Sequence, residues 1–240
     1  MISDLKNAAL SSLKGRWGLG VGTTFLHYVI PAIGMYIIGL LVFVMFGLSL
    51  DLIEPEADTT STFFAELSLF IFCAIIFFIY IAVQSVISYG YYNFTLRLAK
   101  KESTTIGNLF EGFKKNNLFR SIKLGILQAI LIFLWSLLFI IPGIIKFFSY
   151  SMAFYILLEN PEYTASEAIK KSKEMMKGHK LDLFILWLSF IGWFILGSFL
   201  GMFTLNLPYL WISPYYNTTV SHFYLNLVNR NNTVEEKTVI

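Results

Sequence analysis

The chain has 240 residues, of which 56% are hydrophobic and 14% charged, and its net charge is +3. A soluble domain carries about 25% charged residues, so this composition excludes an ordinary soluble domain and indicates a membrane protein with several spans. The lone cysteine, Cys73, excludes an intrachain disulfide and a cysteine-rich metal motif.

The first two long apolar segments are residues 17–48 and 63–98. Roughly 20 apolar residues in a helix cross the hydrocarbon core, so each segment predicts one tilted span, and Pro31 predicts a kink in the first. The connection between them is acidic and holds no Lys or Arg, which predicts that it lies outside the cell. Its acidic residues are Asp51, Glu54, Glu56 and Asp58.

The next apolar segment, residues 118–158, is too long for one ordinary span and is interrupted by Pro142-Gly143. It predicts either one kinked helix or a hairpin. Basic segments precede and follow it, and the positive-inside rule places both in the cytoplasm, which favours a hairpin with spans at 118–141 and 143–158. On this interpretation Lys146 reaches the outer interface.

Residues 181–205 and 207–228 predict a last hairpin, followed by a polar tail at 229–240. The prediction is therefore an all-α membrane bundle of six transmembrane helices, arranged as three hairpins in one domain (1–228), with both termini cytoplasmic. Every Lys and Arg except Lys146 then lies on the cytoplasmic side.

A short amphipathic segment precedes each hairpin, at residues 3–16, 105–117 and 164–177. The third has a capping box at Thr164 and Glu167 and a glycine, Gly178, suited to a left-handed helix end. The three segments predict a pseudo-repeat of an interfacial helix plus a hairpin, although ordinary connectors are the alternative. The lysines that would contact anionic headgroups are Lys170, Lys171, Lys173, Lys177 and Lys180.

Polar groups inside the spans are candidates for function, because they are costly in lipid. The candidates are His27, Gln84, Gln128, His222 and Lys146. The two histidines, at similar expected depths, predict a proton relay or a polar cavity, and Gln84 and Gln128 predict the lining of a solute path. Ordinary hydrogen bonds within the protein are the alternative for both pairs. Gly197-x-x-x-Gly201 predicts close helix packing, either inside the protein or at a homodimer interface. No metal-ligand spacing, cofactor motif or catalytic motif is found in the sequence.

Several short motifs resemble the DUF975 family of integral membrane proteins from Firmicutes-type bacteria. They include Gly143-Ile-Ile-Lys146, Ser149-Tyr-Ser-Met-Ala-Phe-Tyr155, Asn160-Pro161, Met175-Met-Lys-Gly-His-Lys180 and Leu188-Ser-Phe-Ile-Gly-Trp193. The chain is also similar, more distantly, to the membrane domain of some glycerophosphodiester phosphodiesterases. The resemblance implies a bacterial cytoplasmic membrane protein and transfers no catalytic residue.

These features predict a non-enzymatic membrane protein that binds lipid, a membrane-active peptide or toxin, or a membrane partner, in an immunity, accessory or envelope-stress role. The alternatives are a small-solute transporter or channel built from the hairpins and, third, an enzyme acting on lipid headgroups. Glutamates interleaved with the lysines of residues 159–180 argue against nucleic-acid binding.

Overall fold

In the computed structural model, which describes residues 1–52 and 59–238, the described chain is helical and contains no strand. This confirms the predicted all-α bundle. The helices are α1 (Ile2–Leu13), α2 (Trp17–Leu52), α3 (Thr59–Ala99), η1 (Ile106–Phe113, a 3₁₀ helix), α4 (Lys115–Leu138), α5 (Ile140–Tyr150), α6 (Ala153–Glu159), α7 (Ala165–Met175), α8 (Lys180–Leu188), α9 (Ile191–Thr204) and α10 (Tyr209–Thr238).

Four described helices are long and apolar enough to cross a membrane, and a bent pair is a fifth candidate. The four are Trp17–Met45, Glu66–Ala99, Lys115–Leu138 and Ile140–Glu159, and the pair is α8 with α9, which bends by 43°. The expected last span, residues 207–228, is helical but is not among these candidates. It lies in α10, whose polar side chains Thr218, Thr219 and Ser221 are fully buried in the protein. The count of six crossings stays a prediction.

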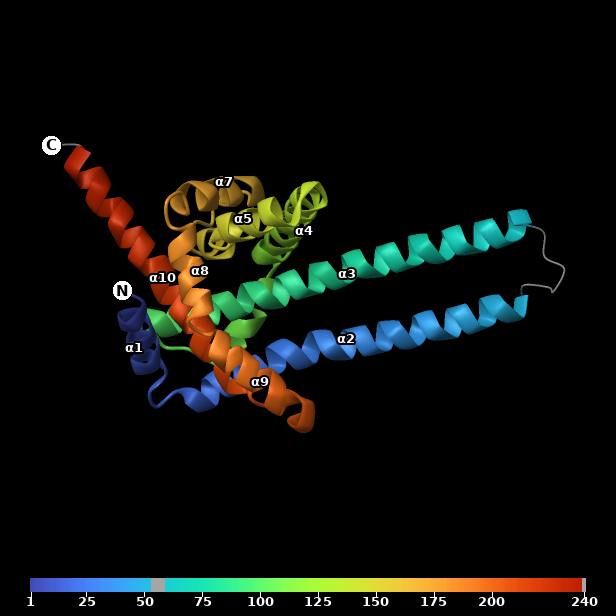
Figure 1. Cartoon of the computed structure of the whole chain (residues 1–240), viewed down its shortest axis with the longest axis horizontal. Coiled ribbons are helices and arrows are strands. Elements are labelled where there is room, and N and C mark those ends of the chain that lie inside the picture. Colours follow the sequence, from blue (N-terminus) through green and yellow to red (C-terminus); the bar gives the residue numbers. More distant parts are fainter. Residues whose placement is uncertain (53–58, 239–240) are drawn as a thin grey trace.

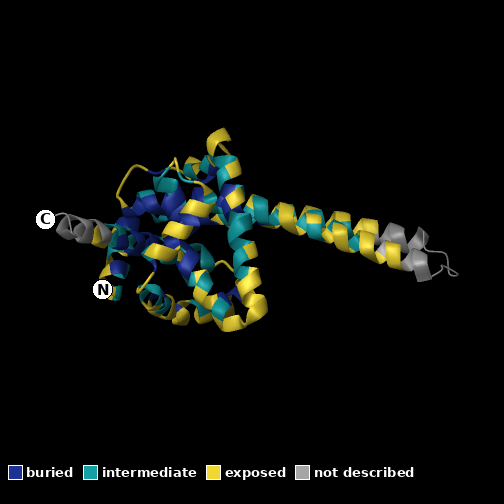
Figure 2. Ribbon diagram, turned by 90° about the horizontal axis from the view of Figure 1, so that it is seen from above, coloured by how far each residue is buried: buried dark blue, intermediate teal, exposed yellow. Residues whose placement is uncertain are grey.

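The α2–α3 hairpin projects far beyond the rest of the molecule (Figure 1). The described side chains of its outer part are mostly exposed, whereas the buried residues gather in the body at the other end (Figure 2). Large apolar side chains such as Phe43 and Phe70 are 75% and 72% exposed. A surface of this kind is stable in hydrocarbon and not in water. The predicted acidic outer loop lies outside the described side chains.

The body is held together where helix backbones approach closely. A Cβ added to Gly90 of α3 would lie 1.7 Å from the carbonyl oxygen of Leu109 in η1. One added to Gly112 of η1 would lie 2.2 Å from the carbonyl oxygen of Val86 in α3. These two glycines therefore let η1 lie directly against α3, and the buried end of α3 is fixed in the core.

The interruption at Pro142-Gly143 is a hairpin, as predicted, but the chain reverses earlier, at Phe139. Phe139 is extended (φ −162°, ψ 151°) between α4 and α5. Pro142 falls in the first turn of α5, where a helix does not need its missing N–H. Gly143 lets α5 approach α4, because a Cβ there would lie 2.1 Å from Ser136 Oγ.

The turns that follow α1 and α7 are alike, whereas the predicted pseudo-repeat of three hairpins stays a prediction. Gly15 and Gly178 both adopt a positive φ, of 75° and 87°. In both turns the next residue donates its backbone N–H three residues back, from Arg16 to Leu13 O and from His179 to Met176 O. The second copy differs, because η1 is a 3₁₀ helix whose Ile106, Phe110 and Phe113 are exposed.

Candidate functional site

A polar groove lies between α3 and α4 and brings together two predicted residues, Gln84 and Gln128. Its volume is about 250 Å³, and it is open at the molecular surface. The two helices come this close beside the groove because α4 has Gly125 where it faces Ser85, and a Cβ there would lie 1.7 Å from the serine hydroxyl. The other lining residues are Tyr80, Ile81, Ser88, Tyr92, Ala129, Ile132 and Phe154.

The amides in the groove are incompletely paired. Gln128 Nε2 donates to Tyr150 O over 3.4 Å, and Gln84 Nε2 donates to Ser88 Oγ over 3.4 Å, both long for such bonds. Gln128 Oε1 is buried and has no partner among the described residues. A buried acceptor without a donor is destabilising, so this oxygen is available to a hydroxyl or N–H of a bound molecule.

The groove is electrically neutral, and it lies close to the amphipathic helix α7. No Lys, Arg, Asp or Glu lines it. Gln128 bonds to Tyr150 at the end of α5, and Ser172 of α7 bonds to the same bend. The Ser172 hydroxyl donates to Ser149 O over 2.9 Å and accepts from Met152 N–H over 3.2 Å. The polar groove and the predicted interfacial helix are therefore side by side along the bundle.

The helix α7 has the form expected from the sequence. Thr164 Oγ1 accepts from Glu167 N–H, and Glu167 Oε2 accepts from Thr164 N–H over 2.7 Å, which confirms the capping box. The bonds from the Thr164 backbone and hydroxyl lower the pKa of Glu167 below its usual value. The buried face of α7 consists of Ala168, Ile169 and Ser172. The outward lysines are Lys170, Lys171, Lys173 and Lys177, all exposed, with Lys180 half-exposed at the start of α8.

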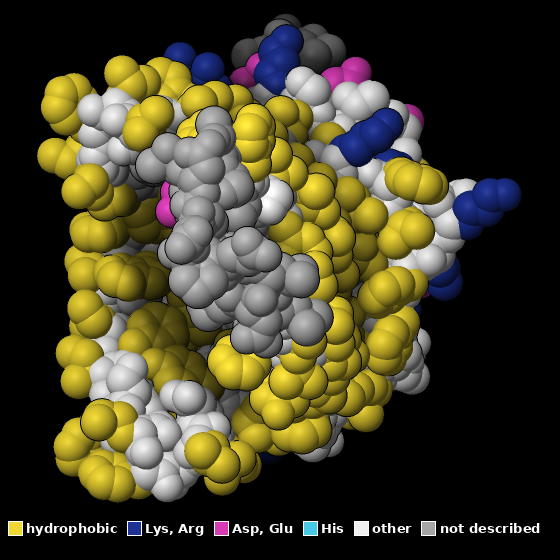
Figure 3. Space-filling view, turned by 90° about the vertical axis from the view of Figure 1, so that its right-hand side faces the viewer, with side chains coloured by type: hydrophobic (Ala, Val, Ile, Leu, Met, Phe, Trp, Pro, Cys, Tyr) yellow, Lys and Arg dark blue, Asp and Glu magenta, His cyan; other side chains and the backbone are white. Residues whose placement is uncertain are grey.

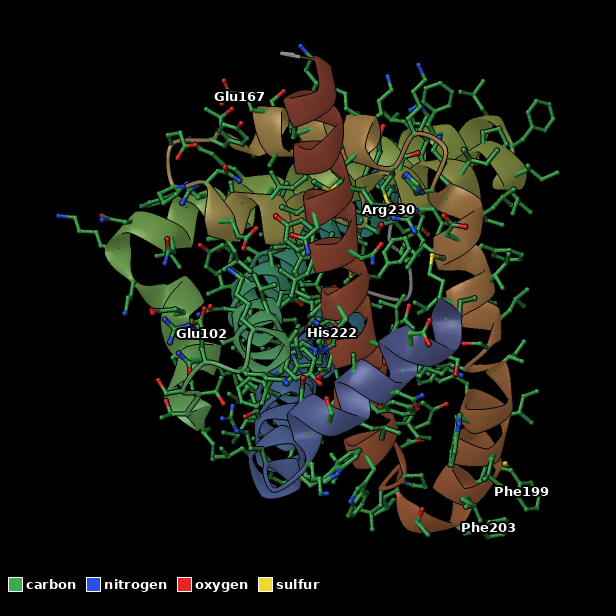
Figure 4. The ribbon with its side chains drawn as sticks, turned by 90° about the vertical axis from the view of Figure 1, so that its left-hand side faces the viewer. Glu102, Glu167, Phe199, Phe203, His222 and Arg230 are labelled. Atoms are coloured by element: carbon green, nitrogen blue, oxygen red, sulfur yellow. The ribbon has the colours of Figure 1, made fainter. Side chains whose placement is uncertain are left out.

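The two histidines do not share a site. The His27 ring stacks on Tyr91 of α3, with centroids 4.4 Å apart, and its Nδ1 has no partner among the described residues. His222 Nε2 instead lies 3.0 Å from Ser12 Oγ, where α1 crosses α10 (Figure 4). Neither residue lines the groove.

The predicted separation of Lys146 from the other lysines is contradicted by the structure, whereas its side of the membrane stays a prediction. Its ammonium lies 4.1 Å from the centre of the Trp135 ring, and the charges of Lys173 and Lys180 act on it. The reason is that α5 packs against α7 and α8, which brings Lys146 to the side of the bundle that carries the other lysines.

The Gly197-x-x-x-Gly201 motif packs helices within this chain. A Cβ on Gly197 would lie 2.7 Å from Ile212 of α10, and one on Gly201 would lie 2.6 Å from the Asn206 side chain. Both glycines thus allow close packing beside the turn between α9 and α10. Beside this turn, an apolar crevice of about 580 Å³ separates α2 from the end of α9. Its lining includes Phe25, Tyr28, Leu205, Leu207 and Leu210.

Two basic residues have structural roles that sequence patterns did not indicate. Arg120 of α4 donates to the carbonyls of Leu157, Asn160 and Tyr163, and so caps the end of α6, where unpaired carbonyls concentrate negative charge. Lys6 of α1 donates to Ser189 O over 2.7 Å at the α8–α9 bend. Burial lowers the pKa of Lys6. Their partners are 37 to 183 residues away in the chain, so only the fold reveals them.

The fold and its apolar helices define an all-helical membrane protein. Residues 141–231 match the model of a family described as a protein of unknown function, DUF975, which confirms the predicted resemblance from α5 into α10. The more distant resemblance to glycerophosphodiester phosphodiesterase membrane domains stays a prediction. No curated protein and no solved structure matches the chain. Within the described residues, no three His, Cys, Asp or Glu side chains form a group that could hold a metal ion.

Proposed function

We propose that this protein is a non-enzymatic phospholipid-binding protein of the bacterial cytoplasmic membrane, with both termini cytoplasmic. The polar groove between α3 and α4 would hold the glycerol and ester region of one lipid. The single observation that carries the proposal is the unpaired Gln128 Oε1 in a neutral groove that is open at the surface of an apolar bundle.

The chemistry of the groove suits an uncharged, hydrogen-bonding part of an amphiphile. Amide and hydroxyl groups bind ester carbonyls and glycerol hydroxyls, and they do not neutralise a phosphate. Exposed apolar side chains continue from the groove along both helices, such as Phe77 on α3 and Phe133 on α4. These side chains would lie along the acyl chains of the bound lipid.

The surroundings of the groove also support a lipid over a transported solute. A transporter needs a polar path between the two sides of the membrane. In α10 the buried Ser221 hydroxyl donates to Thr95 and Tyr155, and the Thr219 hydroxyl donates to the Tyr215 carbonyl, so both are used inside the bundle. The Thr218 hydroxyl has no partner among the described residues. A membrane-active peptide is the alternative occupant, because its backbone amides would satisfy the same groups.

The test is a lipid titration of the purified full chain in detergent, followed by native mass spectrometry. We expect phosphatidylethanolamine to bind Gln128→Leu about tenfold more weakly than the wild type. The substitution removes the hydrogen bonds of the amide but keeps the volume of the side chain. The control is Ser198→Ala, an exposed position on α9 whose hydroxyl lies 2.7 Å from Tyr209 OH and not in the groove. Equal lipid retention by both variants and the wild type would refute the groove as a lipid site.

A further inference from the structure

Three lysines lie on three helices that pack against one another. Lys146 belongs to α5, Lys173 to the last turn of α7, and Lys180 is the first residue of α8. Because α5 packs against both α7 and α8, Lys146 comes within range of the charges of Lys173 and Lys180. The Lys146 ammonium is held over the Trp135 ring, so it is positioned and not free to leave the cluster.

No described carboxylate forms a salt bridge with this cluster. None of its three ammonium groups forms a salt bridge with a described carboxylate; the nearby Asp182 is 2.9 Å from His179 Nδ1. The amino end of α8 has no side-chain cap and adds positive potential from its backbone N–H groups, with Asp182 as the acidic residue of its first turn. Like charges brought together without a counter-charge repel one another, so the cluster favours an anion.

Apolar side chains border the cluster on the membrane side. Ile145 and Phe147 flank Lys146 and are 45% and 53% exposed, and Leu181 follows Lys180 and is 71% exposed. The tip of the α4–α5 hairpin, beyond Lys146, is apolar as well, as seen in the exposed Phe139. Viewed along the α2–α3 hairpin, Lys and Arg gather at the margin of a largely hydrophobic face (Figure 3). Charge and apolar surface therefore adjoin, as the parts of an amphiphile do.

We propose that Lys146, Lys173 and Lys180 bind the phosphate of an anionic phospholipid, whose acyl chains lie along the apolar α5 and α8 surfaces beside them. Ammonium groups donate charge-assisted hydrogen bonds to phosphate oxygens. Trp135 completes the site by holding Lys146 at the interface. This site differs from the neutral groove in its residues and in the lipid charge that it selects.

The experiment compares phosphatidylglycerol with phosphatidylcholine. Each lipid is titrated into the detergent-solubilised full chain, and native mass spectrometry counts the lipid molecules that are bound. The test variant replaces the cluster, Lys146→Gln, Lys173→Gln and Lys180→Gln. The control variant removes the same charge from exposed lysines elsewhere, Lys14→Gln, Lys115→Gln and Lys123→Gln. We expect the wild type and the control to prefer phosphatidylglycerol by at least tenfold at one site, and the cluster variant to lose that preference.

Three results would overturn the proposal. The first is the same loss of preference in both triple variants, which would mean unspecific attraction to net charge. The second is no preference in the wild type. The third is displacement of phosphatidylglycerol by an equal concentration of glycerol 1-phosphate, which would identify a site for a soluble phosphate ester. The groove proposal is tested on a different lipid, the zwitterionic phosphatidylethanolamine, so its failure would be recognised separately from failure of the lysine cluster.

Discussion

Ser172 is the residue whose removal best tests how α7 is joined to the bundle. Its fully buried hydroxyl is the link between α7 and the bend that separates α5 from α6, since it bonds to both Ser149 O and Met152 N–H. Alanine at this position removes both bonds and leaves a buried carbonyl and a buried N–H without partners. Each such group costs about 1–3 kcal/mol, so we expect Ser172→Ala to lower the free energy of unfolding by about 2–4 kcal/mol.

The assay is thermal unfolding of the purified chain in detergent, followed by tryptophan fluorescence. The loss corresponds to a fall in melting temperature of roughly 5–15 °C for a chain of this size. The matched control is Ser166→Ala, an exposed position on the same helix, which should unfold within about 0.5 kcal/mol of the wild type. If the two variants unfold at the same temperature, the buried hydroxyl does not join α7 to the bend and the reasoning fails.

Two further predictions concern α3 and the α4–α5 hairpin. Gly90→Ala should destabilise the protein by about 1–3 kcal/mol, because its Cβ would meet the η1 backbone. The control is Gly39→Ala, whose Cβ would have no atom within 4 Å and which should unfold like the wild type. Equal melting temperatures of the two variants would contradict this prediction. The second prediction uses Phe139→Cys in a Cys73→Ala background. This cysteine should not react with a membrane-impermeant maleimide added from either side. The reason is that about 10 Å of apolar helix separates the hairpin tip from Lys146, so the tip should lie in the hydrocarbon. A cysteine at Ser166 should react from the cytoplasmic side. Labelling of Phe139→Cys from outside intact cells would instead show that the hairpin crosses the membrane.

Much of the fold could be predicted from local patterns. Three predictions agree with the structure: the hairpin at residues 118–158, the capping box at Thr164, and the amphipathic segment at residues 3–16. The buried face of that segment is formed in α1 by Leu5, Ala9, Ser12 and Leu13. Each depends on neighbouring residues only. The turn at Phe139 was displaced from Pro142 because proline is tolerated in the first turn of a helix, so it does not by itself place the reversal.

The candidate sites were predictable as residue types but not as groups. Gln84 and Gln128 could be recognised as costly in lipid, yet their meeting in one groove depends on Gly125 opposite Ser85. His27 and His222 are at similar expected depths but have partners on different helices. Which residues face one another depends on how each helix is rotated about its axis. That rotation is set by all packing contacts of the helix together, so a local sequence pattern does not predict it.

The amino-acid sequence by itself determined that the protein is all-helical and suited to a membrane, because hydropathy and helix ends depend on residues close together in the chain. Only the tertiary structure decided that Lys146 comes within range of Lys173 and Lys180, that the Gln128 side-chain oxygen has no partner among the described residues, and that the polar side chains Thr218, Thr219 and Ser221 of α10 are buried. These features arise from contacts between residues far apart in the chain, which depend on how the helices pack together.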